Sequence, residues 1–159
     1  MDTPETTAEQ ELSAPAQPVA LVVDDRDAHR RRLVGVLQND GWAVIEAEND
    51  KGAALALIDR SIDCAVFPAT LAGAPSAGLV RSAAVIRESH PHPFGILVVM
   101  DTEVPESAER LIRAGADDVI TPCSARSMSR RMRLVHDYRR LLHLNRHLAE
   151  RVARAERKS

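Results

Sequence analysis

The sequence is poor in aromatic residues and cysteines, and it contains no long hydrophobic run. Aromatic residues make up 3% of the chain, which argues against the stacked base platforms of proteins that bind single-stranded nucleic acid. The two cysteines, Cys64 and Cys123, cannot form a disulfide framework. No apolar stretch approaches the roughly 20 residues of a membrane-spanning helix, and no secretion signal opens the chain. We therefore expect a cytoplasmic protein with no membrane partner.

The formal net charge of −2 arises from two parts of opposite sign. From residue 125 to the end there are 11 basic and 3 acidic residues, whereas residues 1–124 contain 10 basic and 20 acidic residues. Such a division is typical of chains with separate functional parts. Residues 1–18 are acidic, rich in Pro, Thr and Ala, and without apolar periodicity, so we predict that they are disordered.

From Val19 onward, short apolar runs alternate with segments of helical periodicity. The expected strands are residues 19–23, 42–45, 64–67, 95–99 and 119–121, and the expected helices are 28–39, 50–58, 77–88 and 105–114. Continuous apolar runs are typical of strands buried on both faces, and each connection is too long for a hairpin. The pattern predicts a doubly wound α/β domain with a five-stranded parallel sheet and a ligand crevice at the carboxyl ends of the strands.

Three motifs of this domain match a known family. They are Leu21-Val22-Val23-Asp24-Asp25, Asp40-Gly41-Trp42, and Gly115-Ala116-Asp117-Asp118. With them, residues 19–138 resemble the receiver domain of bacterial response regulators. The resemblance implies phosphoryl transfer to an aspartate at the end of the third strand. It also implies a Mg²⁺ ion held by the acidic pair and the acceptor aspartate together. A hydroxyl after the fourth strand and a lysine after the fifth strand are implied to bind the phosphoryl oxygens, and the family usually has an aromatic switch residue in the fifth strand.

Four of those functional positions hold residues that cannot do this chemistry. The acceptor position, five residues after Asp63, is Pro68. The hydroxyl position is Met100, the lysine position is Pro122, and the switch-aromatic position is Val119. The only lysines, Lys51 and Lys158, do not follow the fifth strand. We therefore predict a degenerate pseudo-receiver that is not phosphorylated at the family site, is not an enzyme and has no cofactor.

The acidic pair Asp24 and Asp25 is retained. Two carboxylates are too few to hold Mg²⁺ firmly, so we expect no metal and interpret the pair as caps of the first helix and solubilising acids at the rim of the crevice. A Mg²⁺-dependent shift of the amide signals around Asp25 would contradict this interpretation.

A long basic helix is predicted from Ala125 to about Arg157, since this segment lacks Gly and Pro and is rich in Arg, Leu and Ala. Ser124 is its expected N-cap, and Met128, Met132 and Val135 are expected to pack on the sheet.

Residues 139–159 form an extension with a coiled-coil repeat. The stripe, which begins before the extension, consists of Leu134, Tyr138, Leu141, Asn145, Leu148, Val152 and Ala155. A single Asn at an a position favours a parallel two-stranded coiled coil, so we predict a homodimer. The alternatives are a stripe that folds back within the chain and a linker to a further domain.

The polar residues of this helix have several interpretations. His136, His143 and His147 are expected on its outer, solvated face, because a His pair four residues apart needs further ligands to bind a metal. The arginines are expected on the exterior of the coiled coil, with a nucleic acid or an acidic protein as a less favoured partner.

The sequence thus favours a phosphorylation-independent signalling module that dimerises through its last helix and acts on an unidentified signalling protein. The alternatives are the sensory part of a longer protein, with a cyclase, phosphodiesterase, kinase or RNA-binding antiterminator output, and a nucleic-acid-binding protein that uses the basic helix.

Overall fold

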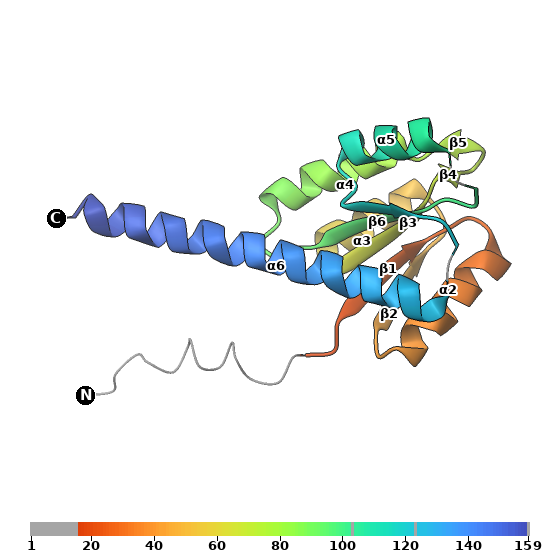
Figure 1. The fold of residues 1–159 in the computed structure, drawn as a ribbon, viewed down its shortest axis with the longest axis horizontal. Coiled ribbons are helices and arrows are strands. Elements are labelled where there is room, and N and C mark those ends of the chain that lie inside the picture. Colours follow the sequence, from red (N-terminus) through yellow and green to blue (C-terminus); the bar gives the residue numbers. More distant parts are fainter. Residues whose placement is uncertain (1–15, 103, 123, 159) are drawn as a thin grey trace.

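Five parallel strands form the central sheet of the computed structural model, which describes residues 16–102, 104–122 and 124–158 (Figure 1). Most of the acidic N-terminal segment, and Cys123, lie outside the described residues. The strands are β1 (Val19–Val23), β2 (Ala43–Ala47), β3 (Cys64–Pro68), β6 (Gly95–Val99) and β7 (Asp118–Ile120). Their order is β2-β1-β3-β6-β7, and every neighbouring pair is parallel. The predicted fold class is confirmed.

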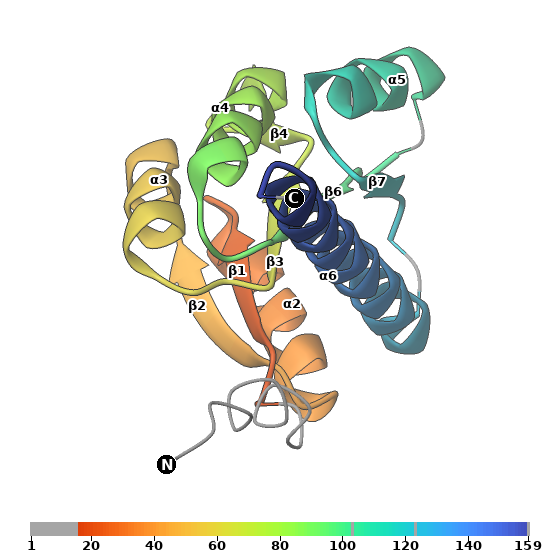
Figure 2. The ribbon, with the colours of Figure 1, turned by 90° about the vertical axis from the view of Figure 1, so that its left-hand side faces the viewer.

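The helices cover both faces of the sheet. They are α2 (Asp27–Asn39), α3 (Asp50–Asp59), α4 (Ala77–Ser89), α5 (Pro105–Ala114) and α6 (Ala125–Glu156). Because side chains alternate along a strand, Leu21 and Val23 lie in one hydrophobic core with α3, α4 and α5, while Ala20 and Val22 lie in a second core with α2 and α6. Figure 2 shows these two layers on either side of the strands.

Local signals set most of the helix ends. The side chain of Asn49 caps α3 by accepting a 2.8 Å hydrogen bond from the Gly52 amide, and Ser124 caps α6 in the same way through the Ser127 amide, at 3.2 Å. Asp27 directly precedes the predicted helix 28–39, which makes it a possible N-cap by sequence. In the structure it is instead the first helical residue of α2, and Arg26 occupies the cap position without a side-chain cap hydrogen bond.

A short hairpin between β3 and α4 was not predicted. Its strands are β4 (Thr70–Leu71) and β5 (Ala74–Pro75), which are antiparallel. Ala72 and Gly73 join them with φ angles of +51° and +76°, the left-handed conformations of a tight two-residue turn. Two residues per strand are too few to show a periodic pattern, so the sequence carried no signal for them.

The last helix, α6, contains 32 residues. Its first part packs on the sheet through Met128, Met132 and Val135, as predicted, and all three are buried. Its C-terminal half projects from the rest of the domain (Figure 1). In the described part of the chain, no helix combines the length and the apolar character needed to cross a bilayer.

Candidate functional site

The carboxyl ends of the strands bring together Asp24, Arg26, His29 and Asp101. Asp24 follows β1 and is almost completely buried, with 1% of its surface exposed. Its backbone amide continues the β1–β2 ladder by donating to Ala47 at 3.1 Å. Its carboxylate is therefore fixed at the floor of the crevice, which corrects the expectation of a solubilising acid at the rim.

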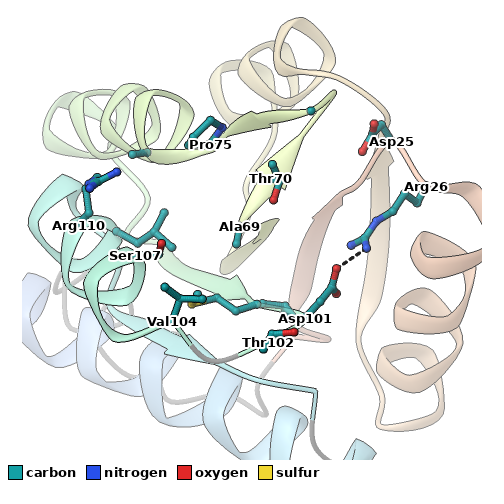
Figure 3. Close-up of a pocket in the computed structure, with 15 residues that line it drawn as sticks. Asp25, Arg26, Ala69, Thr70, Pro75, Asp101, Thr102, Val104, Ser107 and Arg110 are labelled. Carbon is teal, nitrogen blue, oxygen red and sulfur yellow. Dashed lines mark hydrogen bonds and ion pairs between the residues drawn. The ribbon is translucent and has the colours of Figure 1, made fainter.

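The side chain of Arg26 turns back over the sheet and bridges two acids. Its Nε and Nη2 atoms each lie 3.1 Å from a different carboxylate oxygen of Asp24, and its Nη1 atom lies 2.6 Å from Oδ2 of Asp101 (Figure 3). The backbone amide of Arg26 also donates to Asp24, at 2.9 Å. A bidentate guanidinium is a strong and directional partner for a carboxylate. The crevice therefore contains a built-in cation between its acids.

His29, in the first turn of α2, completes this cluster. Its Nδ1 lies 2.7 Å from Oδ2 of Asp24, and its Nε2 lies 3.6 Å from Oδ1 of Asp101. Burial by itself would raise the pKa of Asp24, but hydrogen bonds from Arg26 and His29 outweigh it and hold that pKa below its ordinary value. In return, the hydrogen bonds to Asp24 and Asp101 raise the pKa of Arg26. The cluster consists of mutually neutralising charges.

Asp25, the second acid of the pair, lies apart from Asp24. It is exposed, and its Oδ2 accepts a 3.1 Å hydrogen bond from the amide of Ala72 in the β4–β5 turn. Neither acid accepts a hydrogen bond from a backbone amide in the first turn of α2, so the expectation of capping acids is wrong, although Asp24 accepts from the amide of Arg26 just before the helix.

The four positions singled out in the sequence lie in or just after the strands β3, β6 and β7. Pro68 is buried at the end of β3, and the β1–β3 register, Val22 opposite Val66, places it level with Asp24. Met100 follows β6, is 4% exposed, and donates its amide to Ile120 at 2.8 Å. Pro122 lies exposed beyond β7, and Val119 is half-buried within that strand.

A cleft of about 440 Å³ opens beside the cluster (Figure 3). It lies between the β4–β5 hairpin, the segment after β6 and the first turns of α5. The Arg26–Asp101 ion pair stands on one side of it, and Ser107 and Arg110 from α5 stand on the other.

A second cluster lies at the opposite end of the sheet, just before β3. Asp63 accepts hydrogen bonds from the Val19 amide at 2.7 Å and from His92 at 2.9 Å, and Nε2 of His136 lies 3.2 Å from its Oδ1. The His136 ring also meets Trp42 edge-on. His136 was expected on the outer face of α6, and this expectation is wrong, because at this point the helix still lies on the body.

The base of the projecting part of α6 is held by Asp117. Arg87 of α4 donates to Oδ2 of Asp117 at 2.9 Å, and Arg139 of α6 forms an ion pair with its Oδ1. Asp117 Oδ2 also accepts from the Ile96 amide at 2.8 Å. Asp117 thus connects α6 to the body at residue 139.

The predicted coiled-coil stripe is exposed from Leu134 to Ala155. Leu134, Tyr138, Leu141, Leu148 and Val152 each have more than half of their surface exposed, and Asn145 and Ala155 are exposed as well. The rings of His143 and His147 lie edge-to-face, 4.9 Å apart. Among the described residues, no group of three or more His, Cys, Asp or Glu side chains could hold a metal ion.

Comparison with solved structures places this fold among receiver domains. A receiver domain protein from Methanospirillum hungatei is 20% identical, with a TM-score of 0.70, and the match covers 79% of this chain and 98% of that one. A response regulator from Thermotoga maritima is 25% identical, with a TM-score of 0.66, and the match covers 77% and 99%. A response regulator from Burkholderia pseudomallei, solved with a phosphorylated aspartic acid, a calcium ion and citrate, is 20% identical, with a TM-score of 0.63 and coverage of 70% and 64%.

No family model matches the sequence, and no curated protein matches it. The likeness therefore rests on the structure. The chain has the fold of the response-regulator receiver domain, a signalling module, with a long C-terminal helix.

Proposed function

We propose that this protein is a pseudo-receiver, a signalling module that acts without phosphorylation, through contacts with other proteins. The observation that carries the proposal is the content of the crevice. Pro68 stands where the third strand ends beside Asp24, and the Arg26 guanidinium bridges Asp24 and Asp101.

The chemistry of these residues supports the proposal. An aspartyl phosphate forms when a carboxylate oxygen attacks phosphorus, and the ring of Pro68 has no such atom. A bound Mg²⁺ needs several hard oxygen ligands, but both carboxylate oxygens of Asp24 already accept hydrogen bonds from Arg26 and His29. Placing a divalent ion there would require breaking these bonds and would bring it next to a guanidinium. Arg26 thus supplies internally the positive charge that a metal would bring.

Phosphorylation can be tested directly. The purified full chain is incubated with acetyl phosphate and MgCl₂, and its intact mass is measured, with the Burkholderia response regulator treated in parallel as a positive control. We expect no added phosphate on this chain. A mass increase of one phosphate that disappears in the Asp101→Asn or Asp25→Asn variant would overturn the proposal.

We further propose that the exposed stripe of α6 pairs with the same stripe of a second copy. Two faces of this helix are apolar and nearly perpendicular: Met132 and Val135 pack on the sheet, whereas Leu134 and Tyr138 remain exposed. A projecting helix with an unpaired apolar face is marginally stable in water. Asn145 at an a position favours the parallel two-stranded arrangement, and a second copy brings an identical, complementary stripe.

Sedimentation equilibrium of the full chain at tens of micromolar tests this pairing. We expect a dimer for the wild-type protein and a monomer for Leu141→Glu, which places a charge in the stripe. The matched control is Arg140→Glu, which makes a charge change at the next residue, outside the stripe. A wild-type monomer at all concentrations, or a dimer that survives Leu141→Glu, would contradict the proposal.

The output is proposed to be contact with another signalling protein. Exposed apolar residues of α5 and of the segment before it, Ile112 and Val104, favour a partner surface next to the crevice. A pull-down with wild-type protein and with Ile112→Glu, followed by identification of the captured proteins, tests this. We expect a partner that the wild type captures and Ile112→Glu does not. If both proteins capture the same set of partners, Ile112 does not belong to the contact surface.

A further inference from the structure

The cleft beside the Arg26 cluster has the size and lining of a small-molecule site. Its volume of about 440 Å³ falls within the roughly 300–1,000 Å³ of typical ligand pockets. It lies on the α5 side of the Arg26–Asp101 ion pair (Figure 3), and Asp24 is not among the residues that line it.

The interior of the cleft is mainly apolar. Val99, Met100 and Leu111 are buried residues of the domain that also border the cleft. Ala69 and Ala77, after β3 and at the start of α4, are small and leave the space open between the hairpin and α5. An apolar surface of this shape favours a ligand with an apolar body.

The polar groups of the cleft differ in whether they are already engaged. Its acids are engaged: Asp101 pairs with Arg26, and Asp25 accepts from the Ala72 amide. By contrast, within the described part of the chain, the guanidinium of Arg110 forms no ion pair, and no hydrogen bond engages the hydroxyls of Thr70, Thr102 or Ser107.

Arg110 is therefore the unneutralised charge at the cleft. Glu106, one helical turn before it, forms no ion pair with it in the described residues, and Glu109 is paired with Arg113 at 2.5 Å. A guanidinium without a carboxylate partner at the rim of an apolar cavity is suited to a carboxylate, sulfonate or phosphate group.

We propose that this cleft binds a small molecule with an apolar body and one anionic group, which pairs with Arg110 while the body lies against Met100, Val99 and Leu111. The inference goes beyond the proposed function, because it would hold whether or not the chain dimerises or is phosphorylated.

Two probes that differ only in the anionic group test it. The first is 8-anilinonaphthalene-1-sulfonate, and the second is N-phenyl-1-naphthylamine, the same apolar body without the sulfonate. Each is titrated by fluorescence into the full chain and located by amide chemical shifts. We expect saturable binding of both, with shifts at Thr70, Thr102 and Ser107.

Three variants separate the contributions. Arg110→Gln is expected to weaken binding of the sulfonate probe roughly fivefold or more and to leave the neutral probe unchanged, because a hydrogen bond to a charged group is lost. Arg113→Gln, three residues along the same helix, should change neither. Ser107→Phe, which fills the cleft, should abolish binding of both.

The proposal is overturned if the shifts map to the stripe of α6, if neither probe saturates, or if Arg110→Gln weakens both probes equally. Arg110 is exposed, so its substitution leaves the fold intact. A failure of Ser107→Phe to fold would leave the comparison of the two probes in Arg110→Gln as the deciding result.

Discussion

Nε2 of His136 lies 3.2 Å from Oδ1 of Asp63, joining α6 to the amino end of β3. Together with His92 and the Val19 amide, His136 places three donors on one largely buried carboxylate. Polar contacts thus join the projecting helix to the body at Asp63 through His136 and at Asp117 through Arg139, in addition to the ion pair of Arg131 with Asp118 of β7.

This arrangement predicts a pH dependence of stability. Burial would raise the pKa of Asp63, but hydrogen bonds from His136, His92 and the Val19 amide outweigh it and hold that pKa well below its ordinary value. At pH values between the pKa of Asp63 in the folded protein and its value of about 3.9 in the unfolded chain, the unfolded chain binds more protons than the folded protein does. The contribution of Asp63 is therefore complete above about pH 4 and is lost as the pH falls further.

The expected result concerns the Asp63→Asn variant in urea denaturation. At pH 7 it should unfold with a free energy about 1–3 kcal/mol lower than that of the wild type, since a charged acceptor is lost, and the difference should shrink towards pH 3. The pKa of Asp24 is also lowered, but Asp24 is unchanged in this variant, so its contribution cancels in the difference from the wild type. The matched control is Asp59→Asn, which removes an exposed carboxylate. A difference that does not change with pH would contradict the role given to this carboxylate.

Replacing Arg26 should leave the carboxylates of Asp24 and Asp101 without the cation that bridges them. In Arg26→Ala, the buried Asp24 loses its bidentate partner, and we expect a loss of about 1–3 kcal/mol in the free energy of unfolding. Millimolar MgCl₂ should then restore part of this stability, because a hydrated Mg²⁺ could take the place of the guanidinium between the carboxylates of Asp24 and Asp101.

Denaturation with and without MgCl₂ measures this effect. The wild type, and Arg31→Ala, which removes an exposed ion pair with Asp27, should show no Mg²⁺ response. Equal responses in all three proteins would show that Arg26 does not take the place of a metal.

Gly95 should be required for the packing of α6. A Cβ at this position would overlap Cγ1 of Val135, so Gly95→Ala should destabilise the fold by about 1–3 kcal/mol. The double variant Gly95→Ala/Val135→Ala should recover part of that loss. Gly35→Ala in α2, where a Cβ would meet nothing within 4 Å, should instead stabilise by about 0.5–1 kcal/mol. Thermal unfolding of these three variants and of Val135→Ala alone tests the overlap, and losses of the two single variants that add up in the double variant would contradict it.

The strands β1, β3 and β6 were predictable from sequence because they are buried on both faces and appear as continuous apolar runs, such as Val19–Val23 and Gly95–Val99. The position of Pro68 followed by counting along one such strand. These features are local, and a parallel sheet with crossover helices leaves few alternative arrangements.

The cluster around Arg26 could not be predicted in the same way. Its bond to Asp101 joins residues 75 positions apart, and an arginine at the start of a helix has the pattern of a solvated residue. His136 was misplaced for a similar reason: it adjoins the exposed heptad stripe, yet its partner Asp63 is distant in sequence. Long-range polar contacts leave no periodic signal.

The orientation of the helix pair provides the last prediction. In a parallel pair with Asn145 at a, Arg151 occupies a g position and Glu156 the following e position, so each Arg151 faces Glu156 of the second copy. Arg151→Glu should therefore weaken the homodimer, because it places an acid opposite Glu156 on both sides, and Glu156→Arg should weaken it by placing two arginines together. An equimolar mixture of the two variants should form a heterodimer in which both 151–156 pairs join an acid to an arginine. The informative measurement is the double variant Arg151→Glu/Glu156→Arg, in which both attractive pairs are regenerated with reversed sign. Sedimentation equilibrium should show weakened association for each single variant and recovery to the wild-type level for the double variant.

An antiparallel pair does not bring residue 151 to residue 156 in this way, so single variants that associate like the wild type, or a double variant that does not recover, would exclude the parallel arrangement.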